Sequence, residues 1–319
     1  MESYDIELQE AIKNGNNICI AGHINPDGDA VSSALGLALC LKMIGKDVTV
    51  LLEDYSHKFY YIKGREMIYK GDYDKLEPDL FIAVDCGSKD RLGDAQSVFD
   101  RTENTINIDH HISNTEYAKY NVVYPNASST SEVVFEIIRN FSVITDEIAS
   151  ALYTGIVSDT GGFKHNCTSP RTHEIASVLI GFEVPYSEIQ NKILYSKSRE
   201  ELNIFIKALN KLKIENGISR VILTKKEILE SGATYKDLDG IVSFILNIDD
   251  VDAAVFVYEK ENGKTKVSMR SISTDVSGIA IKFGGGGHKL AAGADFDCTV
   301  EEAEKIIVKE LEDVVSEGA

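Results

Sequence analysis

Five short apolar runs in the first half of the chain constrain its fold more than any other feature. Segments with helical periodicity separate several of these runs. Near-continuous apolar runs of this length are typical of parallel strands whose two faces are both covered. The pattern predicts an α/β domain in which a parallel sheet carries helices on both faces. The expected strands are residues 17–22, 48–52, 80–84, 105–108 and 120–124.

Helices are expected between and after these strands. Residues 30–44 have the apolar periodicity of a helix, as do residues 146–157 and 171–180. Ser129 and Glu132 have the spacing of a capping box, which predicts the start of another helix.

The pattern changes near the middle of the chain. Around residues 184–198 the apolar periodicity gives way to polar residues that follow Pro185. A chain of 319 residues is long enough for two domains that each bury a core. We therefore place a partly helical linker at residues 185–203, between a first domain of residues 1–184 and a second of residues 204–319.

The second domain is predicted to be a smaller α+β unit. Residues 219–223, 253–258 and 264–270 have the composition of strands, and residues 259–263 form the turn of a hairpin between the last two. Residues 301–315 place their apolar side chains on one face of a helix.

The composition limits the classes of function. The net charge is −18, whereas proteins that follow long nucleic acids neutralise phosphates with Lys and Arg. We therefore expect a short RNA or a small nucleotide as substrate, and no long duplex nucleic acid. An acidity that serves only solubility is the alternative.

Targeting signals and a disulfide framework are not expected. No run approaches the roughly 20 apolar residues that cross a bilayer, and the acidic N-terminus does not have the pattern of a signal peptide. The five cysteines are odd in number and form no C-x-x-C pair. These features predict a cytoplasmic protein without a membrane partner.

Acidic and histidine residues gather at the ends of the expected strands. The carboxyl ends of parallel strands meet at one edge of a sheet, where ligand sites lie. Buried charges are costly unless they are paired or bind metal, so the clusters together predict a metal site. The first cluster alone could instead be a turn whose aspartates cap the next helix. The residues are His23, Asp27 and Asp29 after the first strand, Asp85 after the third, Asp109, His110 and His111 after the fourth, and Asp159 after a helix.

The residue types indicate the metal chemistry. Oxygen and imidazole ligands without thiolate suit Mn²⁺ or Mg²⁺ better than structural zinc. Two such ions can activate a shared water near neutral pH and stabilise charge on the attacking and leaving oxygens. Because four aspartates of the clusters would balance two divalent cations, further positive groups are needed to bind an anionic substrate.

A run of four glycines in the second domain could supply such groups. Consecutive glycines let backbone N–H groups approach an anion closely, and an arginine can clamp a phosphate with two hydrogen bonds. A flexible turn is the alternative for the glycine run alone. The predicted substrate-binding residues are Arg270, Ser271, Gly285, Gly286, Gly287 and His288.

These motifs resemble those of a known family. HINPDGD, VDCGS, IDHH and SDTGG are similar, in this order, to the four motifs of the DHH phosphoesterase superfamily and span the first domain. The segment VSMRSISTDVSGIAIKFGGGGHKLAAG resembles the DHHA1 domain, the substrate-binding partner of DHH domains. In that family the arginine and the glycine loop face the metal site across the interdomain cleft.

The resemblance implies a set of roles. It implies two Mn²⁺ ions, with Mg²⁺ or Co²⁺ as alternatives. Asp109 would orient a histidine, and His111 would face the substrate phosphate. One ion would be held by His23, Asp27 and Asp85, and the other by Asp29, Asp85, His110 and Asp159.

A compact chain with these two domains is most similar to the bacterial nanoRNase and pAp-phosphatase group. The resemblance implies an enzyme, a metal-dependent phosphodiesterase and phosphatase. It would hydrolyse short oligoribonucleotides (nanoRNA) to mononucleotides, 3′-phosphoadenosine 5′-phosphate (pAp) to AMP, or both. Members of this group often form homodimers, so a homodimer is one expectation here.

Other functions stay open at this point. The enzyme could instead cleave a linear or cyclic dinucleotide such as pApA or cyclic-di-AMP, or the chain could be a non-catalytic nucleotide-binding module. A manganese pyrophosphatase would carry a Lys/Arg-rich C-terminal signature in place of the glycine run. An exonuclease of the RecJ type usually adds an OB-fold and a basic groove.

Overall fold

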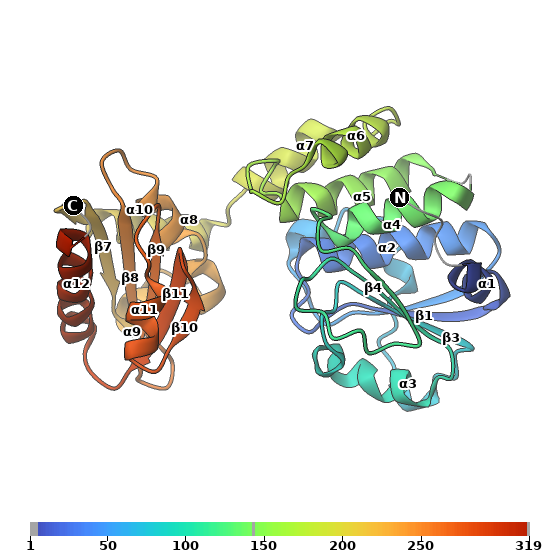
Figure 1. Ribbon diagram of the computed structural model, residues 1–319, viewed down its shortest axis with the longest axis horizontal. Coiled ribbons are helices and arrows are strands. Elements are labelled where there is room, and N and C mark those ends of the chain that lie inside the picture. The colour runs from blue at the N-terminus through green and yellow to red at the C-terminus, as the bar shows by residue number, and fades with distance from the viewer. Residues whose placement is uncertain (1–5, 142–143, 318–319) are drawn as a thin grey trace. The chain divides into compact units, whose positions relative to one another are not determined.

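A computed structural model describes residues 6–141 and 144–317 of the chain. The chain divides into two compact units, one ending at Ser196 and the other beginning at Lys197 (Figure 1). Each unit buries apolar cores of its own. The linker at residues 185–203 stays a prediction. No helix of the described residues is long and apolar enough to span a membrane.

The first unit is built on a sheet of five parallel strands. Their order is β2-β1-β3-β4-β5. β1, β3 and β4 are buried along most or all of their length. β1 and β3 are also mostly apolar, as expected for parallel strands covered on both faces, whereas β4 alternates isoleucines with buried polar residues. The strands are β1 (Asn17–Ala21), β2 (Asp47–Leu51), β3 (Leu80–Val84), β4 (Thr105–Asp109) and β5 (Tyr120–Val123).

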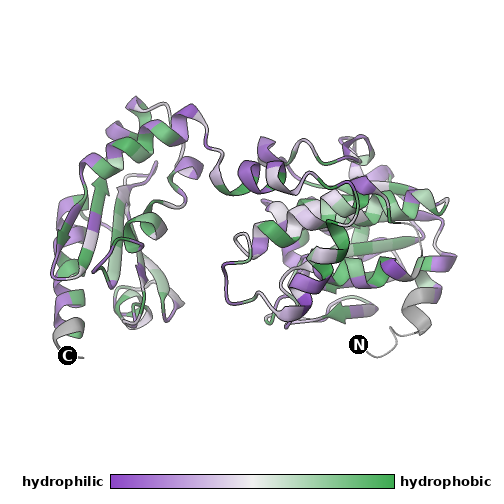
Figure 2. Ribbon diagram, turned by 90° about the horizontal axis from the view of Figure 1, so that it is seen from above, coloured by the Kyte–Doolittle hydropathy of each residue, from purple (hydrophilic) through white to green (hydrophobic). Residues whose placement is uncertain are grey.

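Helices cover both faces of this sheet, which confirms the predicted α/β fold. Ile18 and Ile20 of β1 pack into a core with α2, α4 and α5, whereas Cys19 and Ala21 point into a second core with α3 (Figure 1). Alternation along a strand sends successive side chains to opposite faces. Figure 2 shows the apolar residues concentrated in the strands and the facing sides of the helices. The helices are α1 (Ile6–Asn14), α2 (Gly28–Met43), α3 (Gln96–Arg101), α4 (Thr130–Ile138), α5 (Asp146–Asp159), α6 (Pro170–Leu179) and α7 (Tyr186–Gln190), with a π-helical turn, η6 (Asn191–Tyr195).

The start of α4 differs in detail from the predicted capping box. Ser129 is the N-cap, and its hydroxyl accepts from the backbone N–H of Glu132. The Glu132 carboxylate does not return to the N-cap. It accepts hydrogen bonds from the backbone N–H and hydroxyl of Ser128 and from the hydroxyl of Thr172 in α6. Only half of the capping box therefore forms.

The second unit contains a mixed sheet of six strands in the order β10-β11-β9-β8-β7-β6. Only β7 and β8 pair in parallel. The strands are β6 (Lys213–Glu215), β7 (Ile218–Leu223), β8 (Ala253–Glu259), β9 (Thr265–Ser271), β10 (Gly286–His288) and β11 (Ala291–Phe296). The helices are α8 (Arg199–Asn210), α9 (Lys225–Glu230), α10 (Ile241–Leu246), α11 (Ser277–Lys282) and α12 (Val300–Glu317).

The glycine run is not a free loop. After a turn at Gly284 (φ +73°), its last residues form the edge strand β10, which pairs with β11. A Cβ atom at Gly285 would overlap the carbonyl oxygen of Gly293, and one at Gly287 would overlap that of Ala291. Glycine is therefore required at these two positions for close packing of the hairpin.

Candidate metal centre

The acidic and histidine clusters converge at one edge of the first sheet. His23 follows β1 by two residues, Asp85 directly follows β3, and Asp109 is the last residue of β4. The parallel strands bring their carboxyl ends to this edge. Asp29 joins them from the first turn of α2, and Asp159 is the last residue of α5 rather than part of the loop after it.

The first donor group comprises His23, Asp27 and Asp85, whose ligand atoms lie within 4.8 Å of one another. His23 Nε2 is 3.6 Å from Asp85 Oδ2 and 3.8 Å from Asp27 Oδ2. These separations are too long for hydrogen bonds. They suit donor atoms that surround a common cation.

The second donor group comprises Asp29, His110 and Asp159. His110 Nε2 lies 3.3 Å from Asp159 Oδ2 and 3.6 Å from Asp85 Oδ1. One oxygen of Asp85 thus faces His23 and the other faces His110. The carboxylate is placed where it could bridge two cations, and the donor set of carboxylates and imidazoles fits divalent ions that prefer oxygen and nitrogen ligands.

The backbone around these groups adopts unusual conformations. Asp85 has φ +54° and Asn25, between His23 and Asp27, has φ +52°. Residues other than glycine rarely adopt the left-handed region, and those that do concentrate at functional sites. Asn25 lies in the motif HINPDGD and Asp85 in the motif VDCGS.

The electrostatics of the cluster favour cation binding. Burial raises the pKa of Asp29 and of Asp85 to about 7, and neighbouring carboxylates add to the rise. Burial opposes protonation of His110, but Asp159, Asp29 and Asp85 outweigh it and raise its pKa to about 10. A divalent cation would displace these protons, so cation binding should strengthen as the pH rises.

A segment that the sequence did not point to supports three of these residues. The backbone N–H groups of Thr130 and Ser131, at the start of α4, donate to the two oxygens of Asp29 at 2.5 and 3.0 Å. The Thr130 hydroxyl donates to Asp85 Oδ1 at 2.9 Å. His110 Nδ1 lies 3.3 Å from the carbonyl oxygen of Ala127. The only sequence signal here is the N-cap Ser129, which predicts a helix start but no partner.

Asp109 belongs to no donor group among the described residues, but its partner His111 forms a third group with Asp85 and His110. The buried Asp109 carboxylate is 2.7 Å from His111 Nδ1 and accepts from Asn114 Nδ2 at 2.5 Å. Burial alone would raise the pKa of Asp109, but the hydrogen bonds from His111 and Asn114 outweigh it and lower the pKa. The side chain of His111 is 39% exposed, so its ring can reach solvent or a ligand while Asp109 fixes its orientation.

Arg91 is a further residue at the centre that the sequence did not indicate. It lies in the 3₁₀ segment η4 (Lys89–Ala95), and its Nη2 is 3.1 Å from His23 Nδ1. The same ring nitrogen is 2.7 Å from the carbonyl oxygen of Ile24. A guanidinium therefore stands beside one of the candidate ligands.

The predicted substrate-binding residues of the second unit share one region of its sheet. Arg270 on β9 is opposite Ala291 on β11, which in turn is opposite His288 on β10. Residues opposite one another across strands lie on the same face of a sheet, so Arg270 and His288 share a face and both are exposed. Ser271 is buried, and its hydroxyl donates to the carbonyl oxygen of Thr274. The Ser271 hydroxyl therefore donates its hydrogen bond within the second unit.

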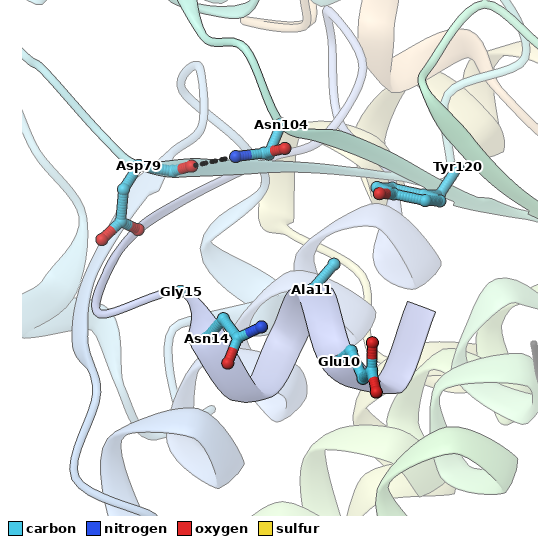
Figure 3. Close-up of a pocket in the computed structure, with 7 residues that line it drawn as sticks. All are labelled: Glu10, Ala11, Asn14, Gly15, Asp79, Asn104 and Tyr120. Atoms are coloured by element: carbon cyan, nitrogen blue, oxygen red, sulfur yellow. Dashed lines mark hydrogen bonds between the residues drawn. The ribbon is translucent and has the colours of Figure 1, made fainter. Parts of the chain in front are cut away.

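A small pocket at the opposite end of the first sheet lacks the features of the metal centre. It is lined by residues of α1 and by residues at the starts of the strands, including Asp79, Asn104 and Tyr120 (Figure 3). Both oxygens of Asp79 accept from the backbone N–H groups of Asn16 and Asn17. We assign this pocket no function.

Comparisons with known proteins agree with the two-unit architecture. Residues 17–156 match the DHH family, N-terminal domain, and residues 217–317 match the DHHA1 domain. The bifunctional oligoribonuclease and PAP phosphatase NrnA of Thermus thermophilus is 31% identical over 303 residues, which cover 92% of this chain and 90% of that protein.

Solved structures share the fold. An exopolyphosphatase-related protein from Bacteroides fragilis has a TM-score of 0.85 and 28% identity, with 96% of this chain and 95% of that chain covered. RecJ from Thermus thermophilus, solved in complex with Mn²⁺, has a TM-score of 0.55 and 15% identity, and the match covers 96% of this chain and 53% of RecJ. At this identity the likeness to RecJ concerns the fold alone.

Proposed function

The chain belongs to the DHH family and is a metal-dependent hydrolase of phosphate esters, and we propose that it converts short oligoribonucleotides to mononucleotides and pAp to AMP. The relative from Thermus thermophilus is named for both activities and is similar over nearly its whole length. The net charge of −18 favours short substrates over long polyanions.

The observation that carries this proposal is the position of Asp85 between two donor groups. Its Oδ2 faces His23 and its Oδ1 faces His110. We assign one Mn²⁺ to His23, Asp27 and Asp85, and a second to Asp29, Asp85, His110 and Asp159. When bound, two such cations supply an activated water near neutral pH and stabilise the charge that develops on the scissile phosphate.

The remaining residues of the first unit orient the reaction. Asp109 accepts from Nδ1 of His111, and this hydrogen bond raises the pKa of the ring. In the protonated ring Nε2 also carries a proton, which it can donate to an oxygen of the substrate. Thr130 and the first amides of α4 hold Asp85 and Asp29 in place. No cysteine belongs to the donor groups found among the described residues, which favours Mn²⁺ or Mg²⁺ over zinc.

In the second unit we assign substrate binding to Arg270, His288 and the glycine strand. Arg270 can form two hydrogen bonds to a phosphate or stack on a base. A Cβ atom at Gly286 would meet nothing within 4 Å, so packing within the unit does not explain the glycine there. Close approach of a ligand to the backbone does explain it.

A substrate panel tests this proposal. The protein is incubated with Mn²⁺ and pAp, pApA, cyclic-di-AMP or RNAs from two to about 24 nucleotides long. We expect turnover of pAp and of the shortest RNAs that falls as the RNA lengthens. Activity that rises with RNA length would contradict the proposal, and turnover of cyclic-di-AMP alone would assign the enzyme to cyclic dinucleotides.

A further inference from the structure

We infer that Arg91 binds a second phosphate of the substrate, next to the phosphate that is hydrolysed. The inference rests on the proposed function, because it names a contact for a nucleotide bound at the same centre. The first unit would then hold its substrate at two phosphates, one at the cations and one at this guanidinium.

The backbone fixes Arg91 against the loop that carries His23. The Arg91 carbonyl oxygen accepts from the N–H of Ile24 at 2.8 Å, and the Arg91 N–H donates to Ser88 at 3.1 Å. Two residues further on, Gly93 has φ +56°, and a Cβ atom there would lie 2.6 Å from Ile24 Cγ2. The segment thus lies directly on the loop, so the Arg91 side chain starts from a defined position beside the metal centre.

The contact between Arg91 and His23 is not a stable hydrogen bond in the metal-binding form of the ring. Nε2 of His23 faces Asp27 and Asp85, so this nitrogen must carry the lone pair that binds a cation. The ring proton then lies on Nδ1, which donates to the Ile24 carbonyl oxygen at 2.7 Å. Nδ1 has no lone pair left to accept from Arg91. The guanidinium is therefore available to another acceptor.

Arg91 also lacks a carboxylate partner in the part of the chain that the structure describes. Lys89, two residues earlier, pairs with Asp100 at 3.0 Å. Within residues 6–141 and 144–317, the Arg91 side chain has one hydrogen-bond contact, to His23. The guanidinium is exposed, so it can meet an anion from solvent. Its planar donors match two oxygens of a phosphate.

The position of Arg91 separates it from the scissile phosphate. The guanidinium contacts the Nδ1 side of the imidazole, while the donor atoms of the centre lie on the Nε2 side. The width of the ring therefore lies between Arg91 and the cations. A phosphate adjacent to the reacting one is the anion that this group can reach, and both pAp and pApA carry such a second phosphate.

The test compares substrates with and without a second phosphate. Arg91→Met, Arg91→Lys and the control Lys89→Met are assayed with Mn²⁺ on pApA, ApA and bis(p-nitrophenyl) phosphate. Because a hydrogen-bonded charge pair is lost, we expect Arg91→Met to raise KM for pApA by about tenfold or more. KM for the two single-phosphate substrates should stay within about twofold. Arg91→Lys should recover part of the loss, and Lys89→Met should match the wild type.

Two results would overturn the inference. An equal rise of KM on all three substrates would place Arg91 at the scissile phosphate or in the support of the fold. An unchanged KM on all three would show that Arg91 does not contact the substrate. Mn²⁺ titration and thermal unfolding of Arg91→Met should match the wild type, since a structural role would change them.

Failure of the proposed function gives a different result. In that case the wild type cleaves bis(p-nitrophenyl) phosphate but no nucleotide. Inhibition of that reaction by pAp then tests Arg91 independently. Weaker inhibition of Arg91→Met than of the wild type supports the phosphate contact, and equal inhibition contradicts it.

Discussion

The Thr130 hydroxyl donates a hydrogen bond of 2.9 Å to Oδ1 of Asp85, the oxygen that also faces His110. The backbone N–H of the same threonine donates to Asp29 at 2.5 Å. Thr130 is fully buried, so these bonds do not compete with water. One residue at the start of α4 therefore orients a candidate ligand of each donor group.

Removing this hydroxyl should weaken metal binding. Thr130→Val keeps the shape of the side chain but leaves Asp85 without its donor, whereas Thr130→Ser keeps the donor. Because supporting partners of metal ligands typically contribute tenfold or more to affinity, we expect Thr130→Val to lower Mn²⁺ affinity by about tenfold. Mn²⁺ titration measures the effect.

Thr102→Val is the matched control for that experiment. Thr102 is also buried, but its hydroxyl donates to the carbonyl oxygen of Val98 in α3. Thr102→Val should therefore leave the Mn²⁺ affinity unchanged. Equal affinities of Thr130→Val and the wild type would show that Asp85 keeps its position without the hydroxyl.

Asp109→Asn should lower turnover and leave metal binding intact. Asp109 contacts His111 and Asn114 and belongs to none of the donor groups among the described residues. An amide holds the ring less firmly and does not stabilise its charge, so we expect kcat to fall by about a hundredfold. Steady-state kinetics and Mn²⁺ titration separate the two effects, with the exposed Asp90→Asn as control. A large loss of Mn²⁺ affinity would instead make Asp109 a ligand.

The glycine strand allows structural and substrate roles to be separated. Gly286→Ala should leave thermal stability unchanged and raise KM for pAp by several-fold, because its Cβ meets nothing within the unit. Gly285→Ala should lower Tm, because its Cβ would overlap Gly293. Gly278→Ala, where the added methyl also has open space, is the control for activity. A Gly286→Ala enzyme with an unchanged KM would exclude close substrate approach there.

Asp252 should contribute acid-sensitive stability to the second unit. It accepts hydrogen bonds from Ser273 and Thr274, in the loop that follows β9. Burial would raise its pKa, but these bonds outweigh it and lower the pKa. A lowered folded-state pKa stabilises the protein above the unfolded value of about 3.9, and this contribution is lost as the pH falls through the folded value.

Thermal unfolding at a series of pH values tests this. Asp252→Asn should have a lower Tm than the wild type at pH 7, and the difference should shrink as the pH falls below about 4. The exposed Asp249→Asn should show neither effect. A Tm difference independent of pH would mean that the charge of Asp252 is not what stabilises the loop.

The sequence predicts the first sheet and the convergence of the clusters well, for a physical reason. Parallel strands buried on both faces are typically near-continuously apolar, and their carboxyl ends meet at one edge. Finding His23, Asp85 and Asp109 at the ends of three of the expected strands therefore indicates that they are close in space.

Contacts between distant backbone and side-chain atoms could not be predicted in this way. The bond from Thr130 N–H to Asp29 joins residues 101 positions apart, and a backbone amide leaves no mark on residue type. Arg91 was missed because one arginine in a polar segment has no periodicity. The strand at Gly286–His288 was missed because glycine is depleted in strands. Close packing against β11 requires glycine at Gly287, which only the structure shows.

The central claim is that Asp85 connects two metal sites, and the number of bound ions tests it most directly. Equilibrium dialysis with Mn²⁺ should give about two ions per wild-type chain. Asp85→Asn, which keeps the shape of the side chain, should bind fewer, and turnover of pAp should fall by about tenfold or more. A folded Asp85→Asn variant that still binds two Mn²⁺ and keeps wild-type turnover would contradict the account.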